Sequence, residues 1–60
     1  MEIKNTIKRL KETAKQLEKD KLEAKHIWLR SDLMTAYRSL NLTIKNLETA
    51  LENIYDYQGN

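Results

Sequence analysis

The chain has 60 residues, of which 40% are hydrophobic and 33% are charged, and its formal net charge is +2. A chain this short forms one domain at most, and it buries only about 60% of the surface that its unfolded form exposes. With no cysteine and one histidine, it can form neither a disulfide framework nor a Cys/His zinc site. We therefore expect residues 1–60 to form a single domain that needs self-association or a partner for stability.

Helix-forming residues dominate from residue 2 to about residue 57, with no proline and one glycine, Gly59. Apolar residues recur in alternating steps of four and three, the spacing of helices that pack side by side. The first of these seams lapses at Lys21, and its members are Ile3, Ile7, Leu10, Ala14, Leu17, Ala24 and Trp28. The second seam is unbroken and consists of Leu33, Tyr37, Leu40, Ile44, Leu47, Leu51 and Ile54.

The two seams would lie on different sides of one straight helix, because the step from Leu17 to Leu33 turns the helix by roughly 160°. A break between the seams lets them face each other. Ser31 and Asp32 suit the start of a second helix, as an N-cap and a first-turn acid. The sequence thus predicts an all-α antiparallel helical hairpin, with helices over about 2–29 and 32–57, that assembles into a coiled-coil-like oligomeric bundle. A break near 18–21 and a single uninterrupted helix are the alternatives.

The charges favour the antiparallel arrangement. Residues 1–30 carry a net charge of +4 and residues 31–60 a net charge of −2. The start of the first helix is basic and the end of the second is acidic, each against its own helix dipole. Folding the helices back on each other brings these opposite charges together.

The longest apolar run, Ile27 to Leu29, is far shorter than the ~20 residues that span a bilayer. We expect a cytoplasmic protein that does not enter a membrane, in the host cytoplasm if the protein is viral.

No sequence motif of an enzyme, a cofactor site or a metal site is present, and we expect a non-catalytic protein without a cofactor. The sharpest local feature is a lysine row along one side of the first predicted helix, formed by Lys4, Lys8, Lys11, Lys15 and Lys19. Such a row suits phosphate groups or an acidic protein surface, with Lys8, Lys11 and Lys15 at its centre. The alternative is a solvated flank that pairs with the second helix or a sister chain.

Aromatic and arginine side chains near the predicted break are further candidates for binding. Trp28 and Tyr37 can stack on a ligand, and Arg30 and Arg38 lie close to them in sequence. The small net charge and the acids among the lysines disfavour long nucleic acids. The expected partners are therefore further copies of the chain, together with another protein or a small anionic nucleotide.

Residues 38–51 resemble the last helix of small phage hairpin proteins that sequester cyclic-oligonucleotide immune signals. The residues in register are Arg38, Leu40, Leu42, Ile44, Leu47, Glu48 and Ala50. Ser39 and Asn53 depart from the family pattern. The resemblance implies an oligomeric, non-enzymatic sponge, and it marks Arg38 as a candidate ligand contact.

The sequence therefore predicts a non-catalytic helical interaction protein that self-associates and binds a partner, in the manner of a phage inhibitor or regulator of a host protein. A sponge for an anionic cyclic nucleotide signal is the alternative.

Overall fold

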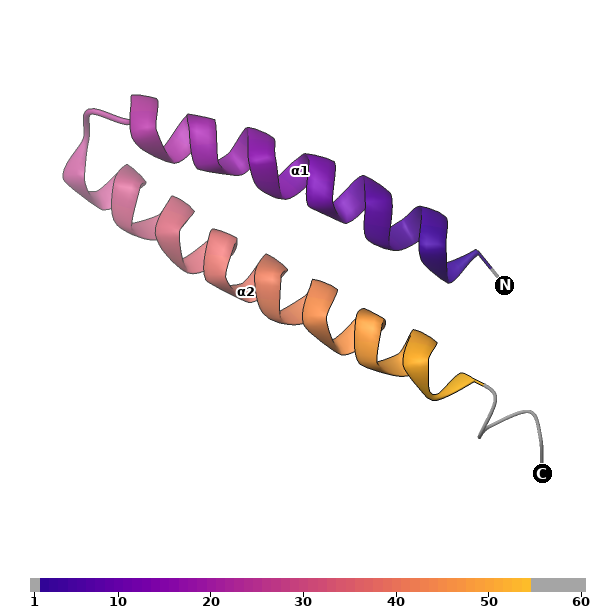
Figure 1. Ribbon diagram of the computed structural model, residues 1–60. Coiled ribbons are helices and arrows are strands. Elements are labelled where there is room, and N and C mark those ends of the chain that lie inside the picture. Colours follow the sequence, from indigo (N-terminus) through magenta and orange to yellow (C-terminus); the bar gives the residue numbers. More distant parts are fainter. Residues whose placement is uncertain (1, 55–60) are drawn as a thin grey trace.

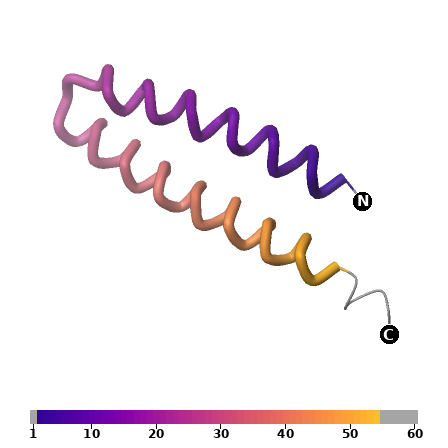
Figure 2. Tube along the Cα trace, in the orientation of Figure 1, coloured from indigo at the N-terminus to yellow at the C-terminus, as the bar shows by residue number. Residues whose placement is uncertain are grey.

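The computed structural model describes residues 2–54, which form two helices packed side by side in opposite directions (Figure 1). Helix α1 spans Ile3–Glu23 and helix α2 spans Ile27–Glu52. The hairpin measures 51 × 16 × 11 Å, and the start of α1 and the end of α2 lie at the end away from the turn (Figure 2). The prediction of an all-α antiparallel hairpin is confirmed.

The predicted helix boundaries were wrong, because the turn lies at residues 24–26 rather than at 29–32 or 18–21. Ser31 and Asp32 lie inside α2, and the Ser31 carbonyl accepts a bond from the Thr35 hydroxyl. Helix α2 ends at Glu52, and the predicted end at residue 57 lies outside the described residues.

Side chains close this turn in place of glycine or proline. Ala24 leaves the helix with extended backbone angles, φ −67° and ψ 123°. His26 is the N-cap of α2, since its Nδ1 accepts the Trp28 backbone N–H at 3.2 Å. Arg30 donates two bonds from its guanidinium to the Ala24 carbonyl, at 3.2 and 2.8 Å. These bonds satisfy backbone groups that a helix end leaves without partners.

A thin core runs along the line where the two helices meet. Ile7 and Ala14 of α1 and Ile44 of α2 are buried, and Ala24 is buried at the turn. Half-buried residues of both predicted seams pack against this cluster, namely Ile3, Leu10, Leu40, Leu47 and Leu51. The second seam is confirmed throughout, and the first from Ile3 to Ala24. Trp28 is a correction, because it lies in the first turn of α2 with 72% of its surface exposed.

The first seam does not lapse at Lys21. This residue keeps the four–three spacing between Leu17 and Ala24, and it is half-buried. Its ammonium lies 4.8 Å from the centroid of the Tyr37 ring, which occupies the facing seam. A cation over an aromatic face is attracted by the ring's negative charge density. A charged residue therefore continues the apolar seam as far as the turn.

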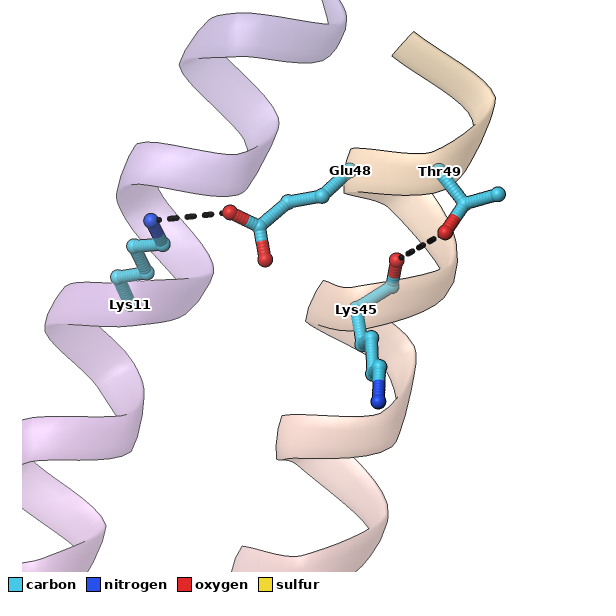
Figure 3. Close-up of polar contacts among 4 residues, drawn as sticks. All are labelled: Lys11, Lys45, Glu48 and Thr49. Carbon is cyan, nitrogen blue, oxygen red and sulfur yellow. Dashed lines mark hydrogen bonds and ion pairs between the residues drawn. The ribbon is translucent and has the colours of Figure 1, made fainter. Parts of the chain in front are cut away.

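One ion pair joins the two helices within residues 2–54, and it is made by Lys11 and not by the first basic residues of α1. Lys11 Nζ of α1 lies 3.2 Å from Glu48 Oε2 of α2, in an exposed ion pair (Figure 3). Exposed pairs contribute at most about 1 kcal/mol, so this contact favours the antiparallel alignment more than it adds to stability.

Candidate interaction surfaces

The heptad positions assign every other side chain to a side of the hairpin. With the seams labelled a and d, Lys11 and Glu48 both fall at e. Their ion pair shows that the e positions of the two helices lie on the same side of the hairpin, as in an antiparallel coiled coil. The b positions lie next to e on the helical wheel. The e and b positions of α1 and α2 therefore line one broad side, which we call the basic flank.

Basic residues gather on this flank. With the seam cations Lys21 and Arg30, its basic side chains are Lys4, Lys8, Lys11, Lys15, Lys21, Arg30, Arg38 and Lys45. Its acids are Glu18, Glu48 and Glu52. The remaining positions show the reverse excess. Their acids are Glu2, Glu12, Asp20, Glu23 and Asp32, and their bases are Arg9, Lys19 and, in the turn, Lys25. The fold thus separates charges that are mixed along the sequence.

Two shallow hollows mark the turn end of the basic flank. One, of about 280 Å³, is lined by Lys21, Leu22, Arg30 and Met34. The other, of about 320 Å³, is lined by Ile27, Arg30, Ser31, Met34, Thr35 and Arg38. Both share Arg30 and Met34, and both expose more apolar than polar surface. Apolar depressions therefore adjoin guanidinium groups at this end.

The lysines at the centre of the predicted site lie away from this end. Lys8 and Lys15 are exposed on the basic flank, and Lys8 lines a separate polar hollow with Asn5, Arg9 and Glu12. Lys11 is engaged by Glu48, which supports the alternative reading of the lysine row for that one residue.

The predicted aromatic and arginine residues separate into different roles. Arg30 and Arg38 come together at one hollow. Tyr37 is half-buried in the seam below Lys21, and Trp28 is exposed. The seven predicted residues thus do not converge on one point.

A second candidate surface follows the side of α2 that faces away from α1. The f positions of α2 hold Trp28, Thr35, Leu42 and Thr49, which we call the outer row. Trp28 and Leu42 are 72% and 60% exposed. None of the four is charged, whereas the f positions of α1 hold Asn5, Glu12 and Lys19.

The outer row also satisfies its own polar groups. The Thr35 hydroxyl donates to the Ser31 carbonyl at 3.2 Å, and the Thr49 hydroxyl donates to the Lys45 carbonyl at 3.1 Å (Figure 3). A surface whose hydroxyls are already bonded loses little when water leaves it. The outer row is therefore suited to an apolar contact.

Sequence reasoning missed Lys21 and Leu22 as parts of a surface. Lys21 was read as a lapse in the seam, although counting it restores the four–three spacing. Leu22 and Met34 become neighbours only when the turn lies at residues 24–26. The sequence signal for Leu22 was a large apolar residue at a position off the seam. In the structure 72% of its surface is exposed.

Within residues 2–54 no group of three or more acidic or histidine side chains is arranged to hold a metal ion. Neither α1 nor α2, the helices of the described part of the chain, has a stretch long and apolar enough to cross a membrane.

The arrangement defines a two-helix hairpin with a basic flank and an uncharged outer row. Comparison with protein-family models, with curated proteins and with solved structures gave no match to the chain.

Proposed function

We propose that the chain is a non-catalytic helical interaction module that self-associates through the outer row of α2. The observation that carries this proposal is the exposure of Trp28 and Leu42 on a row without charge. Exposed apolar patches mark sites of association in soluble proteins, and Trp28 lies in one at the start of α2. Ile27 and Leu29, which are 74% and 50% exposed beside Trp28, extend the apolar area at the turn.

The thin core gives a thermodynamic reason for association. Only Ile7, Ala14, Ala24 and Ile44 are buried among the described residues, and no side chain there is fully enclosed. Each large apolar side chain removed from water contributes about 1.5–3 kcal/mol, a large share of the total stability of a small domain. Two copies paired along their outer rows bury Trp28 and Leu42, with the two α2 helices in contact and an α1 helix on the far side of each.

The non-catalytic part of the proposal rests on the use of the one histidine. His26 accepts a backbone hydrogen bond as the N-cap of α2, so its ring serves the turn. Arg30 at the hollows is likewise engaged, since its guanidinium binds the Ala24 carbonyl.

Sedimentation of a charge variant tests the proposal. Leu42→Glu places a carboxylate in the outer row, and we expect it to convert a concentration-dependent dimer into a monomer. Asn41→Glu is the matched control, because it adds the same charge to the neighbouring exposed residue on the basic flank. A monomeric parent at high micromolar concentration, or equal effects of both variants, would contradict the proposal.

A second candidate function, the sequestering of an anionic cyclic nucleotide, is favoured by the hollow that Arg30 and Arg38 share. Guanidinium groups bind phosphate through paired hydrogen bonds, and Met34 offers apolar contact to a base. Calorimetry with a cyclic dinucleotide tests this candidate. It predicts binding by the parent and a large loss in Arg38→Gln, and the absence of heat with the parent would exclude it.

A further inference from the structure

The basic flank meets the outer row at Thr35, which lines one of the hollows, but its charged residues form a surface of their own. Among residues 2–54, Lys11 is the only basic side chain that forms an ion pair. Lys4, Lys8, Lys11 and Lys15 follow one another at steps of four, three and four, which bring like charges close on a helix and destabilise it slightly. Because positive side chains without an ion pair gather on one side of the hairpin, we expect this side to attract an acidic partner.

We propose that the basic flank binds an acidic amphipathic helix of another protein, which lies in the groove between α1 and α2. One hollow is lined by both helices, by Lys21 and Leu22 of α1 and by Arg30 and Met34 of α2, and a third helix packs against two neighbouring helices at the usual helix–helix distances. The acidic side chains of the incoming helix then face the lysines of α1 and Arg38 and Lys45 of α2.

The hollows at the turn specify the apolar side of this partner. Leu22, Ile27 and Met34 line depressions beside Arg30 and Arg38. Apolar side chains at helical spacing fill such depressions, while acids next to them meet the guanidinium groups. The site therefore requires both apolar anchors and negative charge on one helix.

A nucleic acid fits these features less well. Glu18 and Glu48 stand within the basic flank and would repel a continuous phosphate backbone. Apolar hollows also give no favourable contact to phosphates or sugars. An acidic helix can place apolar or neutral residues opposite these two acids, because its charges do not follow a fixed repeat.

A designed peptide provides the probe. It is about four heptads long, with leucine at the seam positions and glutamate beside them, which makes its own pairing unfavourable at neutral pH. We expect the parent chain to bind it with a gain in helicity by circular dichroism, and the affinity to fall as salt is raised. A peptide of the same composition in scrambled order carries the same charge without the apolar face, and we expect it to bind at least about tenfold more weakly.

Two charge reversals of the same chemistry locate the site. Arg38→Glu changes the basic flank, and we expect it to weaken peptide binding at least about tenfold, because like charges then meet. Arg9→Glu makes the same change at a position outside the flank, and we expect less than about a threefold effect, since solvent screens this exposed charge from the peptide. Met34→Gln keeps the charge and removes the apolar wall of both hollows, and it is also expected to weaken binding.

Several results would overturn the proposal. Equal binding of the ordered and scrambled peptides would show that charge alone is recognised. Equal losses in Arg38→Glu and Arg9→Glu would show that the flank has no special role. Tighter binding of duplex DNA, of a cyclic dinucleotide or of anionic phospholipid vesicles than of the peptide would assign the flank to another class of partner. Leu42→Glu separates this proposal from self-association, because it alters the outer row and leaves the basic flank intact.

Discussion

The guanidinium of Arg30 donates two hydrogen bonds to the carbonyl of Ala24, six residues earlier and across the turn. Ala24 is the C-cap of α1, and Arg30 lies in the first turns of α2, so one side chain ties the end of one helix to the start of the next. Arg30 also lines both hollows of the basic flank. The turn and the candidate binding surface thus depend on the same residue.

Replacing Arg30 with lysine tests this link. Lysine keeps the charge but lacks the planar fork that holds one carbonyl with two N–H groups. We expect Arg30→Lys to lower the free energy of unfolding by about 1 kcal/mol, the value of a hydrogen bond of this type at a partly exposed site. Chemical denaturation at one fixed protein concentration measures the effect. Arg38→Lys is the control and should leave stability unchanged, and an equal loss in both variants would contradict the role of Arg30.

The N-cap of α2 gives a prediction of the opposite sign. His26 caps the helix through Nδ1, but asparagine is a stronger N-cap residue. We expect His26→Asn to raise the melting temperature and His26→Ala to lower it, with free-energy changes of about 0.5–1 kcal/mol. Lys25→Ala is the matched control within the turn. An unchanged melting temperature in His26→Ala would show that the cap does not stabilise the turn.

The alternating seams allowed the fold to be predicted, because their spacing is set by helix geometry and survives in the structure from Ile3 to Ala24 and from Leu33 to Ile54. The turn could not be placed from residue types. Ala24, Lys25 and His26 include no glycine, proline or common N-cap residue, whereas Ser31 and Asp32 imitate a helix start. Side-chain bonds from His26 and Arg30 decide the position, and such bonds are visible only once the chain is folded.

The candidate surfaces were predictable in part for the same reason. The lysine row could be read from the sequence, since it lies on one helix. Arg30 and Arg38 line one hollow, and Leu22 and Met34 line the other. Leu22 and Met34 belong to different helices, so their proximity depends on the position of the turn. Lys21 extends the first seam to Ala24, and Arg30 extends the second seam back from Leu33. Counting both as seam residues would have limited the possible positions of the break to the residues between Ala24 and Arg30.

Ile44 is the most sensitive position of the core. It is 6% exposed and packs against Ile7 and Ala14 of the other helix. We expect Ile44→Ala to lower the free energy of unfolding by about 2–5 kcal/mol. This is a large part of the total stability of so small a domain. Loss of helicity by circular dichroism at room temperature is the readout. Asn46→Ala, two residues on and exposed, should retain the parent's helicity, and an Ile44→Ala variant that melts like the parent would refute the seam.

The contact of Lys21 with Tyr37 predicts a coupling free energy. In a double-mutant cycle of Lys21→Gln and Tyr37→Leu, we expect the two effects to be non-additive by about 0.5–1 kcal/mol. Lys19→Gln combined with Tyr37→Leu is the control cycle, because Lys19 lies on the outer side of α1, and its effects should add. Additive effects in the Lys21 cycle would show that the ammonium does not interact with the ring.

The fluorescence of Trp28 measured over a range of protein concentrations tests self-association through the outer row most directly. Trp28 is the only tryptophan of the chain, and 72% of its surface is exposed in the single hairpin. We expect its emission to move to shorter wavelength as concentration rises, in step with the dimer seen by sedimentation, and we expect Leu42→Glu to keep the long-wavelength emission throughout. Emission typical of an exposed indole at concentrations where the parent is dimeric would contradict self-association through the outer row.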